Sequence, residues 1–214
     1  CLECSYRNLG REMDLFQFHV WNDAWAGQDE WLATVEAIRR SGRARFIGIS
    51  INDHQPNNVL HALATGLVDV VQVIYNIFDQ SPEDELFPYC QEHDLGVIAR
   101  VPFDEGALTG HIHPETVFPP EDFRNQYFTG GRKEEVWDRV NHITRVLGVG
   151  IQQMPETALR FCLSAPAVST VIPGTRTRAH AQANAAASDR GPLTADQRSK
   201  LRPFRWEKNF YAEI

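Results

Sequence analysis

Five short apolar segments alternate with amphipathic helical segments along this chain of 214 residues, and this alternation is the feature that most constrains its fold. The first four segments begin about 31, 24 and 27 residues apart, a spacing typical of βα units. The segments are apolar almost throughout, as strands are in parallel sheets covered on both faces. The pattern therefore predicts an α/β fold. The predicted strands are residues 13–20, 44–50, 68–76, 95–101 and 168–172.

Helical periodicity and capping signals predict the helices between these strands. A serine-initiated capping box at Ser81 predicts one helix start, and Pro88 predicts a kink in that helix or a later start. The long connection at residues 102–132 is rich in glycine and proline, and its aromatic residues favour a lid that packs on the protein. Further helices are predicted at residues 29–41, 56–66, 179–187 and 194–201. Two more are predicted after the long connection, one that contains Val136 and Leu147 and one that starts at Pro155.

Two architectures fit a single α/β domain over residues 1–214, a doubly wound sheet and a TIM (β/α)8 barrel. No G-x-G-x-x-G motif follows any strand, which argues against a Rossmann dinucleotide site. The formal net charge is −7, which argues against nucleic acid or an anionic membrane as a partner. No apolar run approaches the ~20 residues that span a bilayer.

The four cysteines predict neither a disulfide framework nor a metal site. Cys1 and Cys4 form a C-x2-C pair that no second pair completes. Cys90 and Cys162 lie on apolar helix faces, as buried thiols do. The expected location is therefore the reducing cytoplasm.

Polar residues follow each strand, at the edge where α/β proteins place their chemistry. His19 ends an otherwise apolar strand and is a candidate catalytic residue. Arg176 follows a Pro-Gly turn and precedes a predicted helix, an arrangement that favours phosphate binding. The polar residues at the strand ends are His19, Ser50, Asn52, Gln72, Arg100 and Arg176.

Five segments, in order, resemble motifs of the aldo-keto reductase family. Residues 13–19 resemble the strand that ends in the family's active-site histidine, and residues 42–50 resemble its next strand, which ends in Gly-x-Ser. Residues 71–76 resemble its Q-x-x-Y-N strand, and residues 102–110 its P-L-x-x-G-x-L-T-G loop. Residues 172–176, with Asn184, resemble its I-P-G-x-R…E-N signature. The resemblance runs to about residue 201. It implies about the last five βα units of a TIM barrel that binds NADP(H) and interconverts aldehydes or ketones and alcohols.

The resemblance implies a role for each matching residue. His19 would orient the substrate carbonyl, and Ser50 and Gln72 would hydrogen-bond the nicotinamide carboxamide. Arg100 stands where many members have an aromatic residue that stacks on the nicotinamide, and a guanidinium can also stack. The sequence departs from the family at Ile51, where asparagine is usual and here follows one place later as Asn52.

The remaining cofactor-binding residues implied by the resemblance fall in two loops and one helix. Pro102, Phe103 and Gly106 would line the pyrophosphate, beside Val101. Arg176 would hold the adenosine 2′-phosphate, so NADPH is favoured over NADH. The residues of the second group are Gly174, Thr175, Arg176, His180 and, beside the adenine, Asn184.

The chain has no segment that matches the family's catalytic Asp, Tyr and Lys, and Tyr6 is not a candidate for that Tyr. We therefore expect an upstream portion before Cys1 and an inactive isolated chain. The expected partner is a small carbonyl or alcohol substrate, and unpaired strand edges predict self-association. Two alternatives stay open. One is a non-catalytic NADP(H)-binding regulatory subunit. The other is an unrelated phosphate-binding TIM enzyme.

Overall fold

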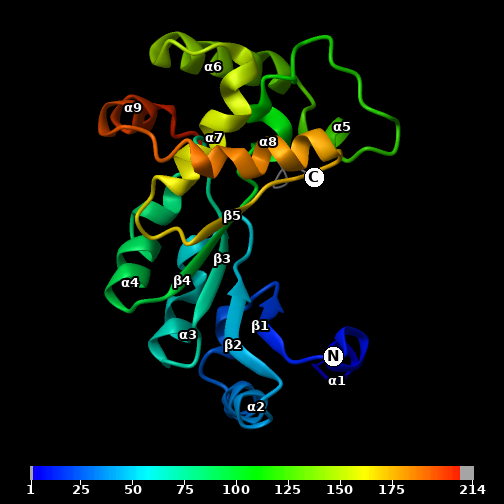
Figure 1. Cartoon of the computed structure of the whole chain (residues 1–214), viewed down its shortest axis with the longest axis vertical. Helices are drawn as coiled ribbons and strands as arrows, with labels where there is room; N and C mark the ends of the chain where they lie inside the picture. The colour runs from blue at the N-terminus through cyan, green and yellow to red at the C-terminus, as the bar shows by residue number, and fades with distance from the viewer. Residues whose placement is uncertain (1, 208–214) are drawn as a thin grey trace. The chain divides into compact units, whose positions relative to one another are not determined.

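The computed structural model describes residues 2–207 and has an α/β fold with five parallel strands, as predicted (Figure 1). Cys1 and residues 208–214 lie outside the described residues. The chain divides into two compact units. The first consists of residues up to 73 and residues 82–98, and the second of residues 74–81 and residues from 99 onward. The strands are β1 (Met13–His19), β2 (Ala44–Ser50), β3 (Val70–Ile74), β4 (Gly96–Arg100) and β5 (Thr170–Ile172).

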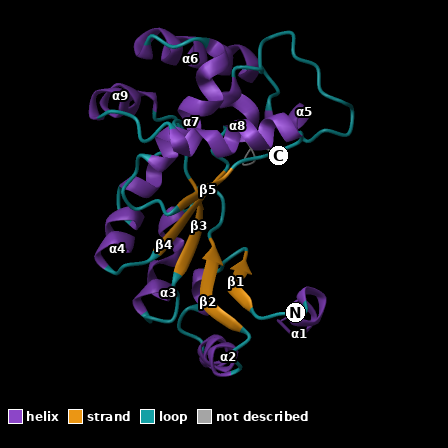
Figure 2. Ribbon diagram, viewed as in Figure 1, coloured by secondary structure: helices purple, strands orange, loops and turns teal. Residues whose placement is uncertain are grey.

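In the first unit the strands lie side by side in chain order from β1 to β4 (Figure 2). β1 pairs with β2 and β2 with β3, both in parallel. Apolar residues at helical spacing on the helix of residues 29–40, Trp31, Val35 and Ile38, are all buried, as the sequence predicts. The helices of this unit are α1 (Leu2–Leu9), α2 (Asp29–Arg40), α3 (Leu60–Ala64) and α4 (Leu86–Glu92).

Gly48 allows an unusually close approach between neighbouring strands of this unit. A Cβ atom at Gly48 would lie 2.9 Å from Cγ of Gln17 and 3.1 Å from Cδ1 of Leu15. It would also lie 3.2 Å from the carbonyl oxygen of Val70, the β3 residue that Gly48 faces in register. The face of the sheet that carries Leu15 and Gln17 is therefore packed tightly at β2.

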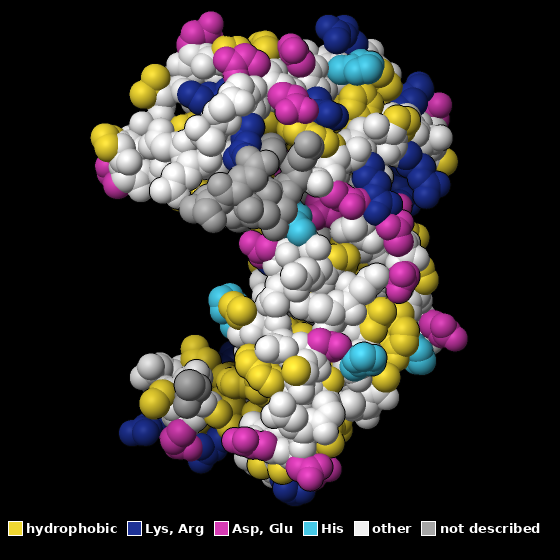
Figure 3. Space-filling view, turned by 180° about the vertical axis from the view of Figure 1, so that it is seen from behind, with side chains coloured by type: hydrophobic (Ala, Val, Ile, Leu, Met, Phe, Trp, Pro, Cys, Tyr) yellow, Lys and Arg dark blue, Asp and Glu magenta, His cyan; other side chains and the backbone are white. Residues whose placement is uncertain are grey.

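Part of the surface of the first unit is hydrophobic. No residue of α1 is buried, and Leu9 at its end is 59% exposed. Phe46 on β2 is 44% exposed. Figure 3 shows hydrophobic side chains at the surface around the N-terminal helix. Self-association through unpaired strand edges stays a prediction.

The second unit contains the long connection and the C-terminal helices. Val136, Val140 and Ile143 are buried along one helix face, as their spacing predicts. The Thr194–Gln197 capping box is confirmed, because the Thr194 hydroxyl accepts from the Gln197 amide and the Gln197 side chain accepts from the Thr194 amide. The helices are α5 (Arg124–Tyr127), α6 (Arg132–Leu147), α7 (Met154–Leu163), α8 (Arg178–Asp189) and α9 (Ala195–Leu201).

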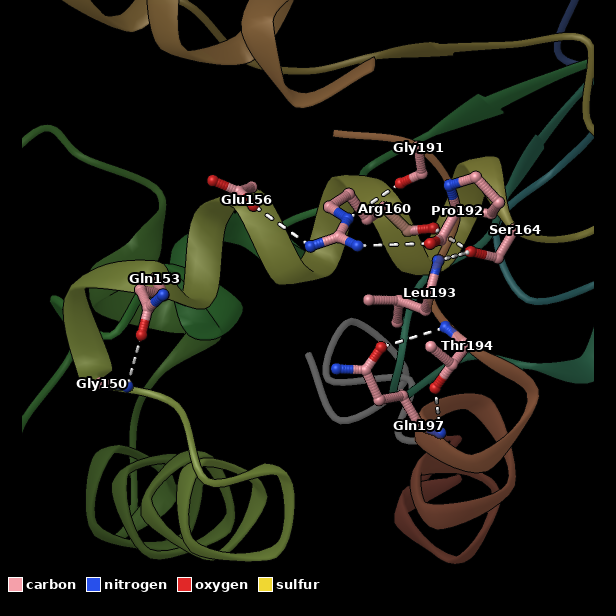
Figure 4. Close-up of polar contacts among 10 residues, drawn as sticks. All are labelled: Gly150, Gln153, Glu156, Arg160, Ser164, Gly191, Pro192, Leu193, Thr194 and Gln197. Atoms are coloured by element: carbon pink, nitrogen blue, oxygen red, sulfur yellow. Dashed lines mark hydrogen bonds and ion pairs between the residues drawn. The ribbon is translucent and has the colours of Figure 1, made fainter. Parts of the chain in front are cut away.

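A polar network attaches the segment between α8 and α9 to α7 (Figure 4). The Arg160 guanidinium donates to the carbonyls of Gly191 at 2.9 Å and Pro192 at 3.2 Å. The Ser164 hydroxyl accepts from the Leu193 amide at 2.7 Å. These bonds satisfy backbone groups that follow the end of α8 and fix where α9 begins.

Two predicted helix starts differ from the structure, and the later start that Pro88 predicts is confirmed. The helix predicted from Pro56 begins as a 3-10 turn, Pro56–Val59, and becomes α3 only at Leu60. The capping box predicted at Ser81 is wrong as a helix start, because the Ser81 hydroxyl and amide both donate to Oδ1 of Asp79 and α4 begins at Leu86. Pro88 is then in the first turn of α4, where its missing N–H costs no helical bond.

The connection at residues 102–132 also contains more structure than predicted. It holds the 3-10 segment Asp104–Thr109 and the short helix α5. Its aromatic residues do pack, since Phe118 lies 5.9 Å from Phe128 in a stacked arrangement and both are buried. Among residues 2–207, no helix is long and apolar enough to cross a membrane.

Candidate functional site

In the first unit, three predicted site residues stand in one row across neighbouring strands: His19 and Ser50 end β1 and β2, whereas Gln72, predicted at a strand end, lies in the middle of β3. His19 pairs in register with Ser50, and Ser50 with Gln72. Alternate residues of a strand share a face, and the Gln17 amide donates to Oε1 of Gln72 at 3.5 Å. This bond indicates that Gln17 and Gln72 share a face, and therefore that His19, Ser50 and Gln72 do too. Ser50 is buried, whereas the His19 side chain is exposed.

The residues after His19 adopt an unusual backbone. Val20 has a φ of 59°, in the left-handed region that β-branched residues avoid. Such a residue costs of order 1–3 kcal/mol and persists only where its surroundings fix it. Trp21 is 1% exposed and packs edge-on against Trp31 at 5.2 Å between ring centroids. The chain is thus anchored in the core directly after the strained position.

In the second unit, a cavity of about 750 Å³ brings together most of the other predicted residues. It lies between the loop after β4, the long connection, and the loop that leads from β5 into α8. Arg100, which belongs to the same unit, does not line it. The predicted residues that line the cavity are Val101, Pro102, Phe103, Gly106, Gly174, Thr175, Arg176, His180 and Asn184.

The loop after β4 approaches this cavity in a strained conformation. Val101, Asp104 and Glu105 have φ values of 52°, 47° and 54°, and Gly106 follows at 104°. Phe103, at φ −99° and ψ 3°, precedes the left-handed Asp104. A right-handed residue followed by a left-handed one turns successive N–H groups toward one point, which is the geometry of an anion-binding nest.

The loop from β5 into α8 is held by its own side chains. The Thr177 hydroxyl caps α8 by accepting from the His180 amide at 3.1 Å. The Asn184 amide donates to Oγ1 of Thr175 at 3.0 Å and to the carbonyl of Gly174 at 3.4 Å. The helix and the loop are therefore pinned together, and Arg176 extends from a fixed turn at the edge of the cavity.

Arg124 also lines the cavity, although no sequence motif indicated it. Its guanidinium forms a two-point ion pair with Asp122, at 2.9 Å from Nε to Oδ1 and 2.5 Å from Nη2 to Oδ2. It also lies over the Phe118 ring, 4.6 Å from the centroid. The signal in the sequence was an Asp-x-Arg sequence among the aromatic residues of a long loop, and whether its arginine reaches the cavity depends on how that loop folds.

Charge is concentrated around this ion pair. Hydrogen bonds from the Arg124 side chain and backbone lower the pKa of Asp122 to about 2, and the charge of Arg176 contributes a smaller part. Asp122 therefore stays ionised at neutral pH. The cavity thus has two guanidinium groups, Arg124 and Arg176, of which Arg124 is partly neutralised by its carboxylate partner.

A parallel α/β fold in which loops after the strands carry polar and charged residues is typical of TIM-barrel proteins. Comparison with known proteins gives the family. The model of the Aldo/keto reductase family matches residues 1–204, and the chain belongs to this family.

The chain is similar to several relatives within the family. It is 28% identical over 134 residues to the NADH-specific methylglyoxal reductase of Escherichia coli, covering 62% of this chain and 37% of the relative. It is 26% identical over 149 residues to the aldo-keto reductase yakc [NADP(+)] of Schizosaccharomyces pombe, covering 68% and 43%. The two names show that relatives differ in their cofactor.

Among solved structures, the holo form of the aldo-keto reductase AKR11C1 from Bacillus halodurans matches with a TM-score of 0.74 and 25% identity. The match covers 98% of this chain and 65% of that structure. The chain thus spans less than half the length of the two curated relatives above and about two thirds of this structure. The predicted barrel is confirmed as a partial aldo-keto reductase TIM barrel.

Proposed function

We propose that this chain forms the carbonyl- and cofactor-binding portion of an NADP(H)-dependent oxidoreductase that interconverts aldehydes or ketones and alcohols. The observation that carries the proposal is the cavity of the second unit. It combines two guanidinium groups, Arg124 and Arg176, with the left-handed backbone that begins at Val101 and the capped start of α8. Such a combination suits a ligand with several phosphate groups.

Arg176 supports NADPH over NADH. A guanidinium binds a phosphate monoester by two parallel hydrogen bonds, and the 2′-phosphate is the group that NADH lacks. Asn184 holds the turn that carries Arg176, through Thr175 and Gly174. Arg124 is proposed to contact the pyrophosphate, because it lies within reach of Gly106 in the loop assigned to that group.

His19, Ser50 and Gln72 are proposed to act at the reacting end. The bound cofactor would supply a hydride. The Ser50 hydroxyl and Gln72 amide can hydrogen-bond a carboxamide group, since each provides a donor and an acceptor. The His19 imidazole is exposed at the end of β1 and can donate an N–H to a carbonyl oxygen, which orients and polarises it.

Ligand binding tests the proposal without requiring turnover. NADPH and NADH are titrated into the protein while the nicotinamide fluorescence is followed. We expect NADPH to bind more tightly, and Arg176→Gln to weaken NADPH by about ten- to a hundredfold, as expected for the loss of one bidentate charge pair. Binding of NADH should change little.

Arg178→Gln is the matched control, because Arg178 lies two residues further along and does not line the cavity. Equal effects of the two substitutions, or no NADPH binding by the wild type, would contradict the assignment of this cavity. Membership of the family excludes an unrelated phosphate-binding enzyme, so tight binding of a sugar phosphate without NADPH affinity would likewise contradict the cofactor assignment.

A turnover assay distinguishes an active oxidoreductase from a non-catalytic regulatory subunit. Reduction of a small aldehyde with consumption of NADPH supports the oxidoreductase. NADPH binding without turnover, in the whole protein as well as in this chain, supports the regulatory subunit. We also propose a reducing cytoplasmic location, because Cys4, Cys90 and Cys162 are free thiols.

A further inference from the structure

The loop after His19 is tied to the following βα unit by an asparagine that stands outside the family pattern. The Asn52 amide donates to the carbonyl oxygen of Trp21 at 2.5 Å. A carbonyl can only accept, so the amide nitrogen of Asn52 must face it. Asn52 comes two residues after Ser50, the strand end that pairs with His19. The bond therefore connects the chain beyond β1 to the chain beyond β2.

The hydrogen bond from Asn52 reaches Trp21, the residue directly after the left-handed Val20. Val20 is left-handed and 58% exposed, so its own side chain packs too little to hold this conformation. What holds it is the next residue, Trp21, whose ring is buried between Trp25 and Trp31 and whose carbonyl is bound by Asn52. Trp21 is thus held at two points, by its buried side chain and by its carbonyl, and the Val20 backbone must span the distance between the end of β1 and this fixed residue.

A second tie holds the same loop two residues further along. The carboxylate of Asp23 lies 2.7 Å from Nδ1 of His61 on α3. His61 is largely exposed, so this contact is weaker support than the buried tryptophans. Both ties come from the βα unit that follows β1. The loop from Val20 to Asp23 is therefore positioned by its neighbour rather than by its own sequence alone.

His19 depends on this arrangement. Among residues 2–207, its imidazole has no hydrogen-bond partner, so no polar contact fixes it and its place depends on the backbone on either side. On one side is β1, in register with β2. On the other side is the left-handed Val20, where a change of φ would swing the end of the strand.

We propose that Asn52 is a positioning residue for His19. By holding the Trp21 carbonyl it keeps Val20 left-handed and so fixes the direction in which the imidazole leaves the end of β1. This inference deepens the proposed function, on which its catalytic consequence rests. It also gives a role to Asn52, which stands one residue after the position at which the family usually has asparagine.

The test uses two variants and one matched control. Asn52→Asp keeps the shape of the side chain but puts a carboxylate against a carbonyl, and Asn52→Ala removes the contact. Asn58→Ala is the control, because it deletes another amide donor of this unit, the bond from Asn58 to Gln55 at 3.2 Å. The first readout is the His19 ring resonance by NMR, assigned with His19→Gln, which needs no turnover.

We expect both Asn52 variants to displace the His19 resonance while Asn58→Ala leaves it in place. Where the wild type reduces a carbonyl, kcat/KM should fall about ten- to a hundredfold with the NADPH Kd unchanged, as for a small misplacement of a reacting group. Val20→Gly should reduce the effect of Asn52→Ala. Glycine adopts a φ of 59° without strain, so the backbone at position 20 then depends less on the hydrogen bond from Asn52 to Trp21.

Three results would overturn the inference. The first is an unchanged His19 resonance in folded Asn52→Asp and Asn52→Ala. The second is a weaker NADPH Kd with His19 unaffected, which would make Asn52 a cofactor ligand. The third is an equal effect of Asn52→Ala with and without Val20→Gly. A wild type that binds no NADPH and reduces no carbonyl would count against the proposed function, and the NMR readout would still decide the role of Asn52.

Discussion

Replacing Gly48 by alanine tests the close packing of β2 against its neighbours. Gly48 does not have a positive φ, so alanine is not excluded by the backbone. The added Cβ would meet Gln17 at 2.9 Å, Leu15 at 3.1 Å and the Val70 carbonyl at 3.2 Å. The two side chains can shift because they are half-buried. The Val70 carbonyl cannot shift freely, because Val70 is the β3 partner of Gly48 in the sheet.

The size of the effect follows from these contacts. Overpacking of a well-packed site costs typically ~1–3 kcal/mol. Alanine is favoured over glycine within a strand by roughly 0.5–1 kcal/mol, which offsets part of that cost. We therefore expect the free energy of unfolding to fall by about 1–2 kcal/mol. For a chain of this size the melting temperature should drop by about 2–8 °C.

Urea and thermal unfolding followed by circular dichroism measure this change. The matched control is Gly27→Ala in the same unit, where no atom lies within 4 Å of the added Cβ and φ is not positive. That control should be neutral or slightly stabilising. Equal stability of Gly48→Ala and Gly27→Ala would show that the added Cβ meets no rigid neighbour and that β2 is not closely packed at Gly48.

Three further predictions concern the rest of the chain. The pKa of Asp122 is lowered from 3.8 to about 2, so its ion pair with Arg124 stabilises the long loop above about pH 4 and is lost as the pH falls toward 2. Limited proteolysis should therefore cut the long loop faster as the pH falls through this range. In Asp122→Asn the cleavage rate should not change with pH in this way, because the ion pair is absent at every pH. Burial raises the pKa of Cys90 to about 12 and that of Cys162 as well, so neither thiol should react with a thiol reagent until urea unfolds the chain; rapid labelling of either in the native protein would contradict their burial. Thr194→Ala should cost about 1 kcal/mol of unfolding free energy and Thr194→Asp much less, because only a side-chain oxygen can cap α9.

Two valines directly after strands have a left-handed backbone. Val20 follows β1 and Val101 follows β4, and both are left-handed although β-branched. The sequence gives no sign of this, because valine is typical of strands and predicts an extended conformation. It goes with tertiary contacts at each position: Trp21 is buried directly after Val20, and the Val101 carbonyl accepts from the Asn76 amide at 3.0 Å. Strain at such positions commonly accompanies function, which agrees with the candidate roles of His19 and Pro102 beside them.

The repeated strand and helix segments were predictable because local periodicity carries their signal. The buried face of α2 and the exact bounds of β2 follow from apolar spacing alone. The start of α4 did not follow, because the Ser81 hydroxyl that predicts a cap instead binds Asp79 in the folded chain. The Ser81 hydroxyl can either cap a helix or bind a neighbouring side chain in a turn, and the folded backbone decides between these two partners.

Most of the residues that line the cavity were predictable from the sequence, but not all of them. Motif resemblance supplied the nine predicted residues that line the cavity of the second unit. It missed Arg124, whose place in the cavity depends on how the long loop folds over Phe118. It also left Asn52 without a role, since a shift of one residue beyond a strand changes which neighbour its amide reaches.

The sequence by itself determined the alternation of strands and helices, the family and the residues at the strand ends, because each depends on neighbours close in the chain. The tertiary structure alone decided that His19, Ser50 and Gln72 share one row, since register joins strands distant in sequence. It also decided that Arg124 and Arg176, more than fifty residues apart, face one cavity. Long-range contacts of this kind arise from packing and hydrogen bonding between segments, which no local pattern encodes.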